Sequence, residues 1–238
     1  MFEKKFAVTE YAGKISALFR TLQDLSGEAA AEWHASGDEL AEKGLIWVIV
    51  RYDVSLLCPP VPGETLTLKT WANPVRHRMS QRNYLAFDES GAPVLRGAGS
   101  WAVVDAVTRA MVDPEERGVT IHGEVNGLEL PRPAAPLRLA LTGETDYDVT
   151  DAVLDRNMHM NNTKYFDAVQ SCMGDIDPAL ALKRIRAMFI SESRAGERIG
   201  ISWGREGDSW YFDGKKDGAS CFQISLEYDP ADPGSIPV

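Results

Sequence analysis

Two short segments of the chain repeat one pattern, and this repeat limits the fold more than any other sequence feature. Residues 63–71 read Gly-Glu-Thr-Leu-Thr-Leu-Lys-Thr-Trp, and residues 196–203 read Gly-Glu-Arg-Ile-Gly-Ile-Ser-Trp. Both segments open on Gly-Glu, place aliphatic residues at alternate positions and end in Thr or Ser before Trp. Alternation with period two is typical of a half-buried strand. A chance likeness between two strand-forming segments is the alternative to a duplication.

The order of the elements around the two segments favours a duplication. Apolar residues recur at helical spacing from residue 15 to residue 25, and residues 162–173 carry a similar stripe. Strands are expected at 45–50, 65–71, 101–105, 186–192, 199–203, 210–212 and 221–228, with a turn at 88–93. Two copies of one unit, a helix packed on an antiparallel sheet, place the chain in the α+β class.

The pattern of apolar and polar residues in two of the expected strands predicts how far each strand is buried. Residues 45–50 form a continuous apolar run, which is expected of a strand buried on both faces. Residues 221–228 alternate cleanly between apolar and polar side chains, which predicts a half-buried strand.

A proline-rich stretch separates the two copies. Pro131, Pro133 and Pro136 lie close together between Gly127 and Gly143. Closely spaced prolines favour an extended, semi-rigid chain. We therefore predict an N-terminal unit at residues 1–128, a linker at residues 129–145 and a C-terminal unit at residues 146–238.

Composition and charge exclude several classes of protein. The chain has 238 residues, is 44% hydrophobic and 25% charged, and has a formal net charge of −10. This acidic balance argues against a nucleic-acid binder, which needs a basic face. The three cysteines have no metal-binding or disulfide spacing, and no metal site or cofactor is expected. No secretory signal and no membrane-spanning run is visible, so a cytoplasmic protein is expected.

The strongest local signal for chemistry lies just before the second expected helix. If residues 155–159 are extended, Asp155, Asn157 and His159 lie on one face of the segment. Asn161 or Asn162 is then suited to cap the helix that follows, and the helix N-terminus can hold a developing oxyanion. A solvated polar loop with asparagine caps and a surface histidine is the other interpretation.

Residues 155–165, Asp-Arg-Asn-Met-His-Met-Asn-Asn-Thr-Lys-Tyr, resemble the D-x-N-x-H-V-N-N-x-K-Y motif of the acyl-acyl carrier protein (acyl-ACP) thioesterases of plants and bacteria. A second family segment, with a glutamate on the next strand, matches residues 189–196 and places that glutamate at Glu192. The resemblance implies a tandem (double) hotdog fold, in which each of two curled antiparallel sheets wraps a helix. It also implies Asp155, Asn157, His159 and Glu192 as a catalytic set that hydrolyses fatty acyl-ACP to free fatty acid and ACP.

The sequence departs from the family pattern at two positions. Ser193 stands where many plant members have Cys, so a Cys-His nucleophilic mechanism has no support here. Met160 replaces a small aliphatic residue, which we interpret as a packing change. We favour a water molecule activated by Glu192 as base, with Asp155 ordering Asn157 and the loop, although either carboxylate is a candidate.

One of the two units is expected to carry the chemistry. Aligning the two copies places Leu56 of the first opposite Glu192 of the second, and residues 9–14, before the first helix, contain no Asn or His. The N-terminal unit is therefore expected to shape the substrate cavity and the C-terminal unit to carry the catalytic residues.

A basic stretch is the candidate docking site for ACP. Arg76, Arg78 and Arg82 lie in a segment without acidic residues between Lys69 and Asp88. Arginine suits phosphate oxygens, so this stretch is expected to bind acidic ACP and its phosphopantetheine arm. An ordinary solvated loop is the alternative.

Other functions on the same scaffold remain open at this point. They are an acyl-CoA thioesterase, a hotdog hydratase or dehydratase, and a non-catalytic module that binds acyl chains or ACP. A monomer and a homodimer are both compatible with two units in one chain.

Overall fold

The computed structural model describes residues 1–8, 14–124, 127–128, 130–177 and 179–230. Within these residues, ten strands form one antiparallel sheet in the order β1-β3-β4-β5-β2-β7-β10-β9-β8-β6. The first half of the chain contains β1 (Phe2–Ala7), α1 (Ile15–Ala31), α2 (Gly37–Glu42), β2 (Leu45–Leu56), β3 (Thr65–Ala72), β4 (Met79–Phe87) and β5 (Pro93–Asp105). The second half contains β6 (Gly143–Asp148), α3 (Lys164–Ser171), β7 (Leu180–Phe189), β8 (Arg198–Glu206), β9 (Ser209–Lys216) and β10 (Ala219–Pro230). Short 3₁₀ turns lie at Glu115–Arg117 and Asp151–Val153.

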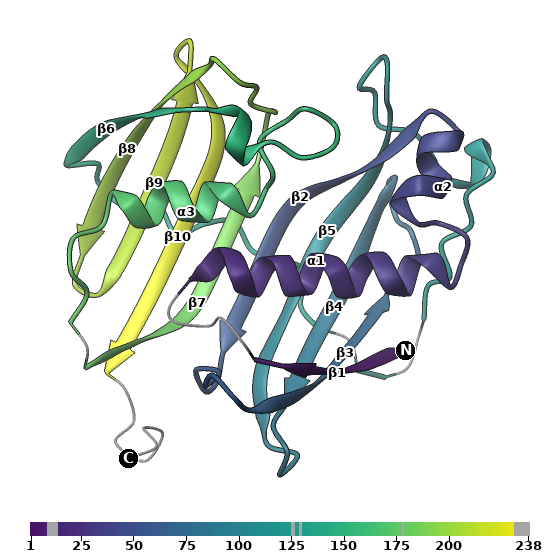
Figure 1. Ribbon diagram of the computed structural model, residues 1–238, viewed down its shortest axis with the longest axis horizontal. Coiled ribbons are helices and arrows are strands. Elements are labelled where there is room, and N and C mark those ends of the chain that lie inside the picture. The colour runs from purple at the N-terminus through teal and green to yellow at the C-terminus, as the bar shows by residue number, and fades with distance from the viewer. Residues whose placement is uncertain (9–13, 125–126, 129, 178, 231–238) are drawn as a thin grey trace.

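The sheet order repeats once, which confirms the duplication. Reading outward from the middle of the sheet, the first half runs β2-β5-β4-β3-β1 and the second runs β7-β10-β9-β8-β6. The two halves join where β2 pairs with β7, with Arg51 opposite Met188 and Ser55 opposite Arg184. Helices α1 and α3 lie on the same face of the sheet (Figure 1). The α+β class and the tandem hotdog architecture are therefore confirmed, whereas the unit boundaries drawn from the sequence stay a prediction.

The Gly-Glu repeat makes the same contacts in both halves. The N–H of Gly63 donates to the carbonyl oxygen of Val8 at 2.8 Å, and the N–H of Gly196 donates to that of Val149 at 2.9 Å. Both glycines have a positive φ, 95° and 83°, which L-residues rarely adopt. Each repeat therefore fixes the start of an inner strand, β3 or β8, to the residue that follows its edge strand, β1 or β6, by the same backbone geometry.

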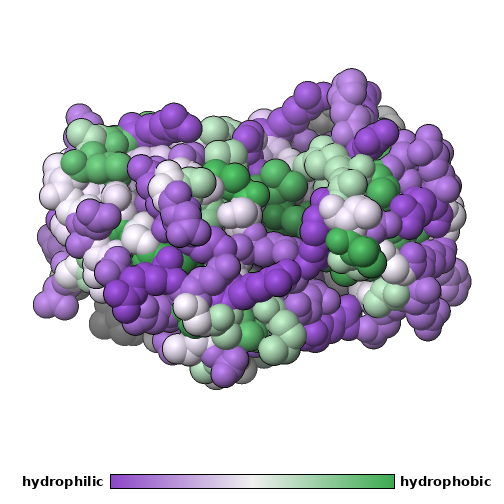
Figure 2. Space-filling model, turned by 90° about the horizontal axis from the view of Figure 1, so that it is seen from above, coloured by the Kyte–Doolittle hydropathy of each residue, from purple (hydrophilic) through white to green (hydrophobic). Residues whose placement is uncertain are grey.

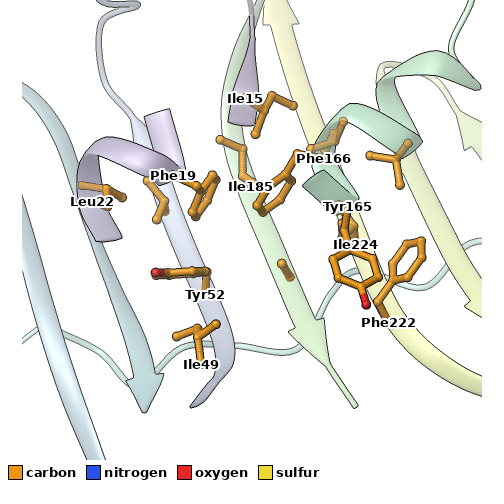
Figure 3. Close-up of a cluster of buried hydrophobic side chains, with 14 of the residues drawn as sticks. Ile15, Phe19, Leu22, Ile49, Tyr52, Tyr165, Phe166, Ile185, Phe222 and Ile224 are labelled. Atoms are coloured by element: carbon orange, nitrogen blue, oxygen red, sulfur yellow. The ribbon is translucent and has the colours of Figure 1, made fainter. Parts of the chain in front are cut away.

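The core joins the two halves beneath their helices. Phe19 of α1 and Phe166 of α3 stack with ring centroids 4.2 Å apart, and both are fully buried. Beneath them, Tyr52 of β2 and Ile185 of β7 complete a continuous apolar layer (Figure 3). A shared core of this kind holds the two halves in one arrangement.

Residues 130–142, within the predicted linker, run over the sheet and contact both halves of it. The N–H of Ala134 donates to Asp53 of β2 at 3.0 Å, and the N–H of Leu137 donates to the hydroxyl of Ser225 on β10 at 3.0 Å. Gln223 and Ser225 are consequently buried. The expectation of a half-buried strand at 221–228 is therefore wrong. The linker covers the face of this strand that carries its polar side chains.

Most expected elements are found, with shifted ends. The helix expected at 15–25 is α1, and the helix expected at 162–173 is the shorter α3. The strand expected at 186–192 ends at Phe189, so Glu192 lies beyond the strand rather than on it. Residues 9–13, for which the sequence expectation concerned the absence of Asn and His, lie outside the described residues. No helix in the described part of the chain has the length and apolarity to cross a membrane.

Candidate active site

Residues 154–160 form a tight loop that is closed by Asp155. Leu154 and Met160 pair across the loop as an isolated antiparallel bridge. The Asp155 Oδ1 accepts hydrogen bonds from the N–H groups of Asn157 at 2.7 Å and of His159 at 3.3 Å. The N–H of Asp155 in turn donates to the carbonyl oxygen of His159 at 2.7 Å. Aspartate favours such turns because its side chain can accept from the backbone two residues further on.

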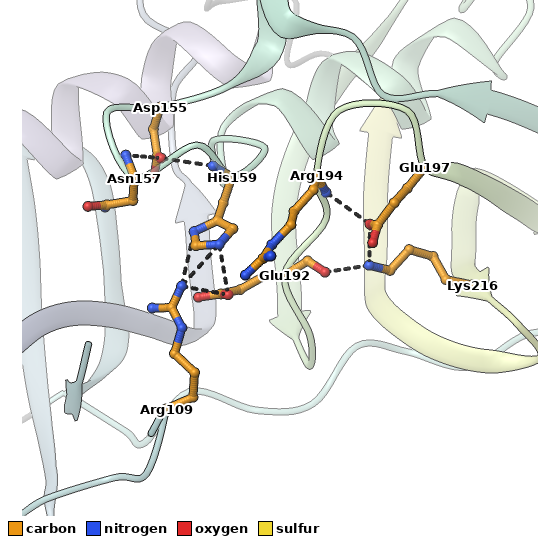
Figure 4. A network of polar contacts seen from close by, with 8 residues as sticks. All are labelled: Arg109, Asp155, Asn157, His159, Glu192, Arg194, Glu197 and Lys216. Atoms are coloured by element: carbon orange, nitrogen blue, oxygen red, sulfur yellow. Dashed lines mark hydrogen bonds and ion pairs between the residues drawn. The ribbon is translucent and has the colours of Figure 1, made fainter. Parts of the chain in front are cut away.

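The expectation that residues 155–159 are extended is therefore wrong. Met158 has a φ of 61°, which reverses the chain between Asn157 and His159. The carboxylate of Asp155 is directed to the backbone of the loop, and the side chain of Asn157 is exposed and points away from the imidazole (Figure 4). Of the four residues expected together, the structure brings only His159 and Glu192 into side-chain contact.

His159 and Glu192 meet at a third side chain, Arg109, which sequence reasoning missed. The Nε2 of His159 lies 3.1 Å from the Oε2 of Glu192. The Nη2 of Arg109 lies 3.0 Å from that same oxygen and 3.0 Å from the same Nε2 (Figure 4). The side chain of His159 is 10% exposed, whereas those of Glu192 and Arg109 are 37% and 34% exposed. A nearly enclosed imidazole thus faces a carboxylate and a guanidinium that solvent can reach.

The segment that carries Glu192 is fixed to its neighbours through the backbone. The N–H groups of Ile190 and Ser191 donate to the carbonyl oxygen of Cys221 at 2.8 and 3.1 Å. The ammonium of Lys216 donates to the carbonyl oxygen of Glu192. The N–H of Met160 donates to the carbonyl oxygen of Ser193 at 2.7 Å. The last contact ties the two motif segments together beside His159.

Ser193 lies in the core and not at the site. Its side chain is fully buried, and it neighbours Cys221, which is 1% exposed. Burial raises the pKa of the Cys221 thiol to about 11, and its Sγ donates to the carbonyl oxygen of Gly214 at 3.2 Å. Neither side chain is placed to react with a bound molecule, because both are buried.

Asn161 fixes the entrance to α3. Its Oδ1 accepts from the N–H and the hydroxyl of Thr163 at 2.9 and 2.8 Å, and its carbonyl oxygen accepts from the N–H of Lys164 at 2.8 Å. The expectation that Asn161 or Asn162 caps the helix is wrong, because Thr163 is the N-cap residue and no side chain caps it; Asn161 closes the turn before it, and Asn162 is half-buried in the same turn. Because two backbone N–H groups at the helix entrance are already bonded to Asn161, they are not available to a substrate oxygen.

The three arginines expected to dock ACP do not share one surface. Arg76 and Arg78 are exposed in a hairpin turn, in which the backbones of Arg76 and Met79 exchange two hydrogen bonds. Arg82 is only 6% exposed, with its guanidinium 5.0 Å from the ring centroid of Trp33. Arg82 is therefore corrected from a docking residue to an interior one, because alternation along β4 turns its side chain to the helix-covered face.

The exposed hairpin turn lies next to the loop that carries Arg109. The Nη1 of Arg78 donates to the carbonyl oxygen of Met111 at 3.3 Å. Met111 is one of several exposed apolar residues on loops that also carry site residues, the others being Val107, Met158 and Ile190. Figure 2 views this end of the molecule and shows a hollow with apolar side chains between the two halves. The site thus has apolar surroundings on one side and a basic turn close by.

A separate cavity of about 850 Å³ lies against α1. Its apolar lining includes Leu18 and Leu22 of α1 with Leu66, Leu68 and Leu95 of the sheet. Leu95 pairs with Leu56 near the end of β5 opposite Asp105, so this cavity is remote from Arg109 along the strand. Among the described residues, no three His, Cys, Asp or Glu side chains are grouped to hold a metal ion.

The two halves of the chain match two models of one family. Residues 2–117 match the acyl-ACP thioesterase N-terminal domain, and residues 139–229 match the acyl-ACP thioesterase C-terminal domain. Palmitoyl-acyl carrier protein thioesterases of Gossypium hirsutum and Arabidopsis thaliana, both chloroplastic, are each 24% identical over 186 and 190 residues. These matches cover 69% of this chain and 45% of each relative, so the chain spans less than half the length of these curated relatives.

Solved structures share the fold over almost the whole chain. An acyl-ACP thioesterase from Bacteroides thetaiotaomicron superposes with a TM-score of 0.81 at 17% identity, covering 96% of this chain and 97% of that one. A 12:0-ACP thioesterase from Umbellularia californica superposes with a TM-score of 0.78 at 19% identity, with the same coverage. With both domain models matched in order along its two halves, this chain belongs to the acyl-ACP thioesterase family.

Proposed function

We propose that this chain hydrolyses the thioester of fatty acyl-ACP and releases a free fatty acid and ACP. One observation carries the proposal, the contact of His159 with Glu192 at 3.1 Å between the two segments that carry the family motifs. The pair is an imidazole and a carboxylate on loops that also carry the exposed apolar side chains of Met158 and Ile190, and Figure 2 shows an apolar hollow between the two halves at this end of the molecule. An acid-base pair of this kind can activate water, and an apolar hollow suits an acyl chain.

In the proposed reaction, water attacks the thioester carbonyl carbon. The carboxylate of Glu192 takes a proton from the water, and His159 orients the carboxylate and relays the proton. The carbon–sulfur bond then breaks, the fatty acid leaves as the carboxylic acid product, and the pantetheine sulfur leaves as a thiol with that proton. Asp155 orders the loop through its bonds to the backbone of Asn157 and His159.

Asn157 remains in the proposal as a donor to the thioester carbonyl. Its side chain is exposed and two residues from His159 on the same loop, so a rotation about its side-chain bonds is enough to change its direction. The helix entrance at Asn161 and Asn162 is the weaker proposal for this role, because Asn161 already bonds two of its N–H groups.

In this proposal the carrier of the acyl chain is ACP, which docks at Arg76 and Arg78. Both side chains are exposed, and Arg78 contacts the loop of Arg109, so a partner bound there lies beside the site. An acidic carrier protein complements these arginines on a chain whose net charge is otherwise −10. This argument favours ACP over coenzyme A as the carrier, since a docking surface outside the pocket serves only a carrier that is a protein.

The test is a thiol-release assay with purified protein and saturated acyl-ACPs of increasing chain length. We expect release of ACP thiol, with His159→Ala as the inactive control. Acyl-CoA of matched length is assayed in parallel, and a preference for it makes the chain an acyl-CoA thioesterase. Absence of thiol release from every substrate, with retained binding of acyl-ACP, identifies a binding module. Water addition to an unsaturated acyl thioester without thiol release identifies a hydratase.

A further inference from the structure

Arg109 reaches the site from the half of the chain that carries no motif residue. It follows β5 of the N-terminal half, whereas His159 and Glu192 belong to the C-terminal half. Its Nη2 lies 3.0 Å from both the Oε2 of Glu192 and the Nε2 of His159, and 3.4 Å from the Nδ1 of the same ring. One nitrogen of this side chain therefore contacts both members of the pair.

The turn that carries Arg109 is built to hold this position. Arg109 has a φ of 60°, a left-handed conformation that costs free energy for a residue with a Cβ. Asp105 fixes the turn, since its Oδ1 accepts from the N–H groups of Val107 and Thr108 at 3.1 and 3.0 Å. The Oδ2 of Asp105 accepts from Arg117 at 3.1 Å, and the N–H of Arg109 donates to the Asp105 carbonyl oxygen at 2.9 Å.

Stability of the fold does not explain this strained turn. The side chains of Arg109 and Glu192 are about one-third exposed, and ion pairs with that exposure contribute little to folding. Val107, at the tip of the turn, is 89% exposed and packs on no core. Besides its backbone bonds within the hairpin and to Gly44, the turn provides the contacts of Arg109 with His159 and Glu192.

The three contacts restrict the proton on His159. A neutral ring nitrogen either donates or accepts a hydrogen bond, and Nε2 faces an acceptor, Glu192, and a permanent donor, Arg109. The Arg109 guanidinium places one donor between the Nε2 of His159 and the Oε2 of Glu192. Arg109 thus holds the imidazole and the carboxylate in contact with each other.

We propose that Arg109 is a positioning residue that holds His159 and Glu192 in contact for proton transfer, so that the N-terminal half completes the site. The inference rests on the proposed thioester hydrolysis. It goes beyond that function because it assigns a role in the reaction to the half of the chain that lacks the motif.

The experiment compares Arg109→Ala, Arg109→Lys and the matched control Arg96→Ala, an exposed arginine at the other end of β5. We expect kcat for acyl-ACP to fall about 10- to 100-fold in Arg109→Ala, less than the ~10²–10⁴-fold for loss of a group that itself transfers a proton, because Arg109 acts through His159 and Glu192. Arg109→Lys should keep part of the activity, and millimolar guanidinium ion should restore part of it to Arg109→Ala. Arg96→Ala should match the unsubstituted protein.

The pH profile separates positioning from a structural role. Without the guanidinium, the pH profile of kcat/KM should change, because a positive charge 3.0 Å from both Glu192 and His159 is removed. The other charged or titratable groups around Glu192 are Lys216, Arg194, Glu197 and Tyr165, and all of them are retained in these variants. Full activity in Arg109→Ala contradicts the inference, and so does a loss without guanidinium rescue and with an unchanged pH profile.

A spectroscopic measurement tests the inference independently of enzyme turnover. The ring nitrogens of His159 are followed by ¹⁵N NMR against pH in the unsubstituted protein and in Arg109→Ala. We expect the ring-nitrogen shifts, which report the hydrogen bonds of Nδ1 and Nε2, to differ between the two proteins, and identical shifts across the pH range contradict the inference. Failure of the unsubstituted protein to release thiol contradicts the proposed function instead, and the NMR comparison still decides the role of Arg109.

Discussion

The guanidinium of Arg82 lies over the ring of Trp33, 5.0 Å from its centroid, inside the N-terminal half. Burial lowers the pKa of Arg82 from its ordinary value, and the charges of Tyr84, Tyr52 and Glu124 oppose that shift. The arginine therefore belongs to the packing beneath α1, although it stands in the same basic stretch of sequence as Arg76 and Arg78. Arg82 is thus close to Arg76 and Arg78 in the sequence but does not share their exposed surface.

Arg82→Ala should destabilise the fold without changing the choice of substrate. We expect the free energy of unfolding to fall by ~1–3 kcal/mol, through lost packing of the arginine stem and a lost cation–π contact. Urea unfolding measures this change, and Arg76→Ala is the control, for which a change within about 0.5 kcal/mol is expected. A selective loss of acyl-ACP turnover in folded Arg82→Ala, with short thioesters unaffected, contradicts the interior assignment.

Arg76→Ala combined with Arg78→Ala should weaken the reaction with acyl-ACP alone. We expect kcat/KM for acyl-ACP to fall ~10-fold, with a smaller salt dependence, because rim charges act mainly on association. The same double variant should hydrolyse a short pantetheine thioester at the normal rate. An equal loss on both substrates argues against docking and for a defect in the site.

Asp155→Asn and Glu192→Gln distinguish the loop carboxylate from the base. Asp155→Asn keeps an oxygen that can accept from the N–H groups of Asn157 and His159, so much of the activity should remain. Glu192→Gln removes the proton acceptor, and we expect kcat to fall ~10²–10⁴-fold. Single-turnover thiol release measures both. Near-normal turnover in Glu192→Gln with an inactive Asp155→Asn reverses the assignment.

Gly63→Ala and Gly196→Ala should destabilise the chain by similar amounts. Both positions have a positive φ, and open space surrounds the place where a Cβ would be added. The cost is therefore backbone strain alone, about 1 kcal/mol in each case. Thermal or urea unfolding of the two variants checks the equivalence of the two halves. A difference of several kcal/mol argues against equivalent turns, and Gly27→Ala, in α1, is a control expected to stabilise slightly.

Asp105 should keep its charge down to strongly acidic pH. The N–H of Thr108, the guanidinium of Arg117 and the N–H of Val107 lower its pKa to about 2. A carboxyl group with a lowered pKa contributes stability above its unfolded-state value near 4, and that stability is lost as pH falls toward about 2. The ¹³C shift of the Asp105 carboxyl carbon should therefore stay constant from pH 7 to pH 4. A titration in that range contradicts the hydrogen-bonded turn described for Arg109.

The sequence predicts the elements whose signals are local. Alternation identifies β3 and β8, helical spacing identifies α1, and the family motif identifies His159 and Glu192, which do lie in contact. Helix α2 was missed although Ser36 and Glu39 form a capping box, a pattern that is readable in the sequence.

The remaining features depend on contacts between distant segments. Arg109 meets His159 through two loops from different halves, and no spacing rule links residues 109 and 159. The loop at 155–159 is a turn because the Asp155 side chain bonds the backbone, which competes with the extended form that spacing alone favours. Ser225 is buried because of the linker, so its burial cannot be read from β10 alone.

Residues 130–142 connect the two halves by contacts that do not depend on the pairing of β2 with β7. This segment bonds Asp53 in the first half and Ser225 in the second, while β2 and β7 pair independently of it. A protease cut on either side of this segment would therefore leave two fragments that are still held together by the shared sheet, the shared core and the hydrogen bonds of residues 130–142. Such fragments are the starting material for complementation, and the two parts of the site could then be varied separately and reassembled by mixing.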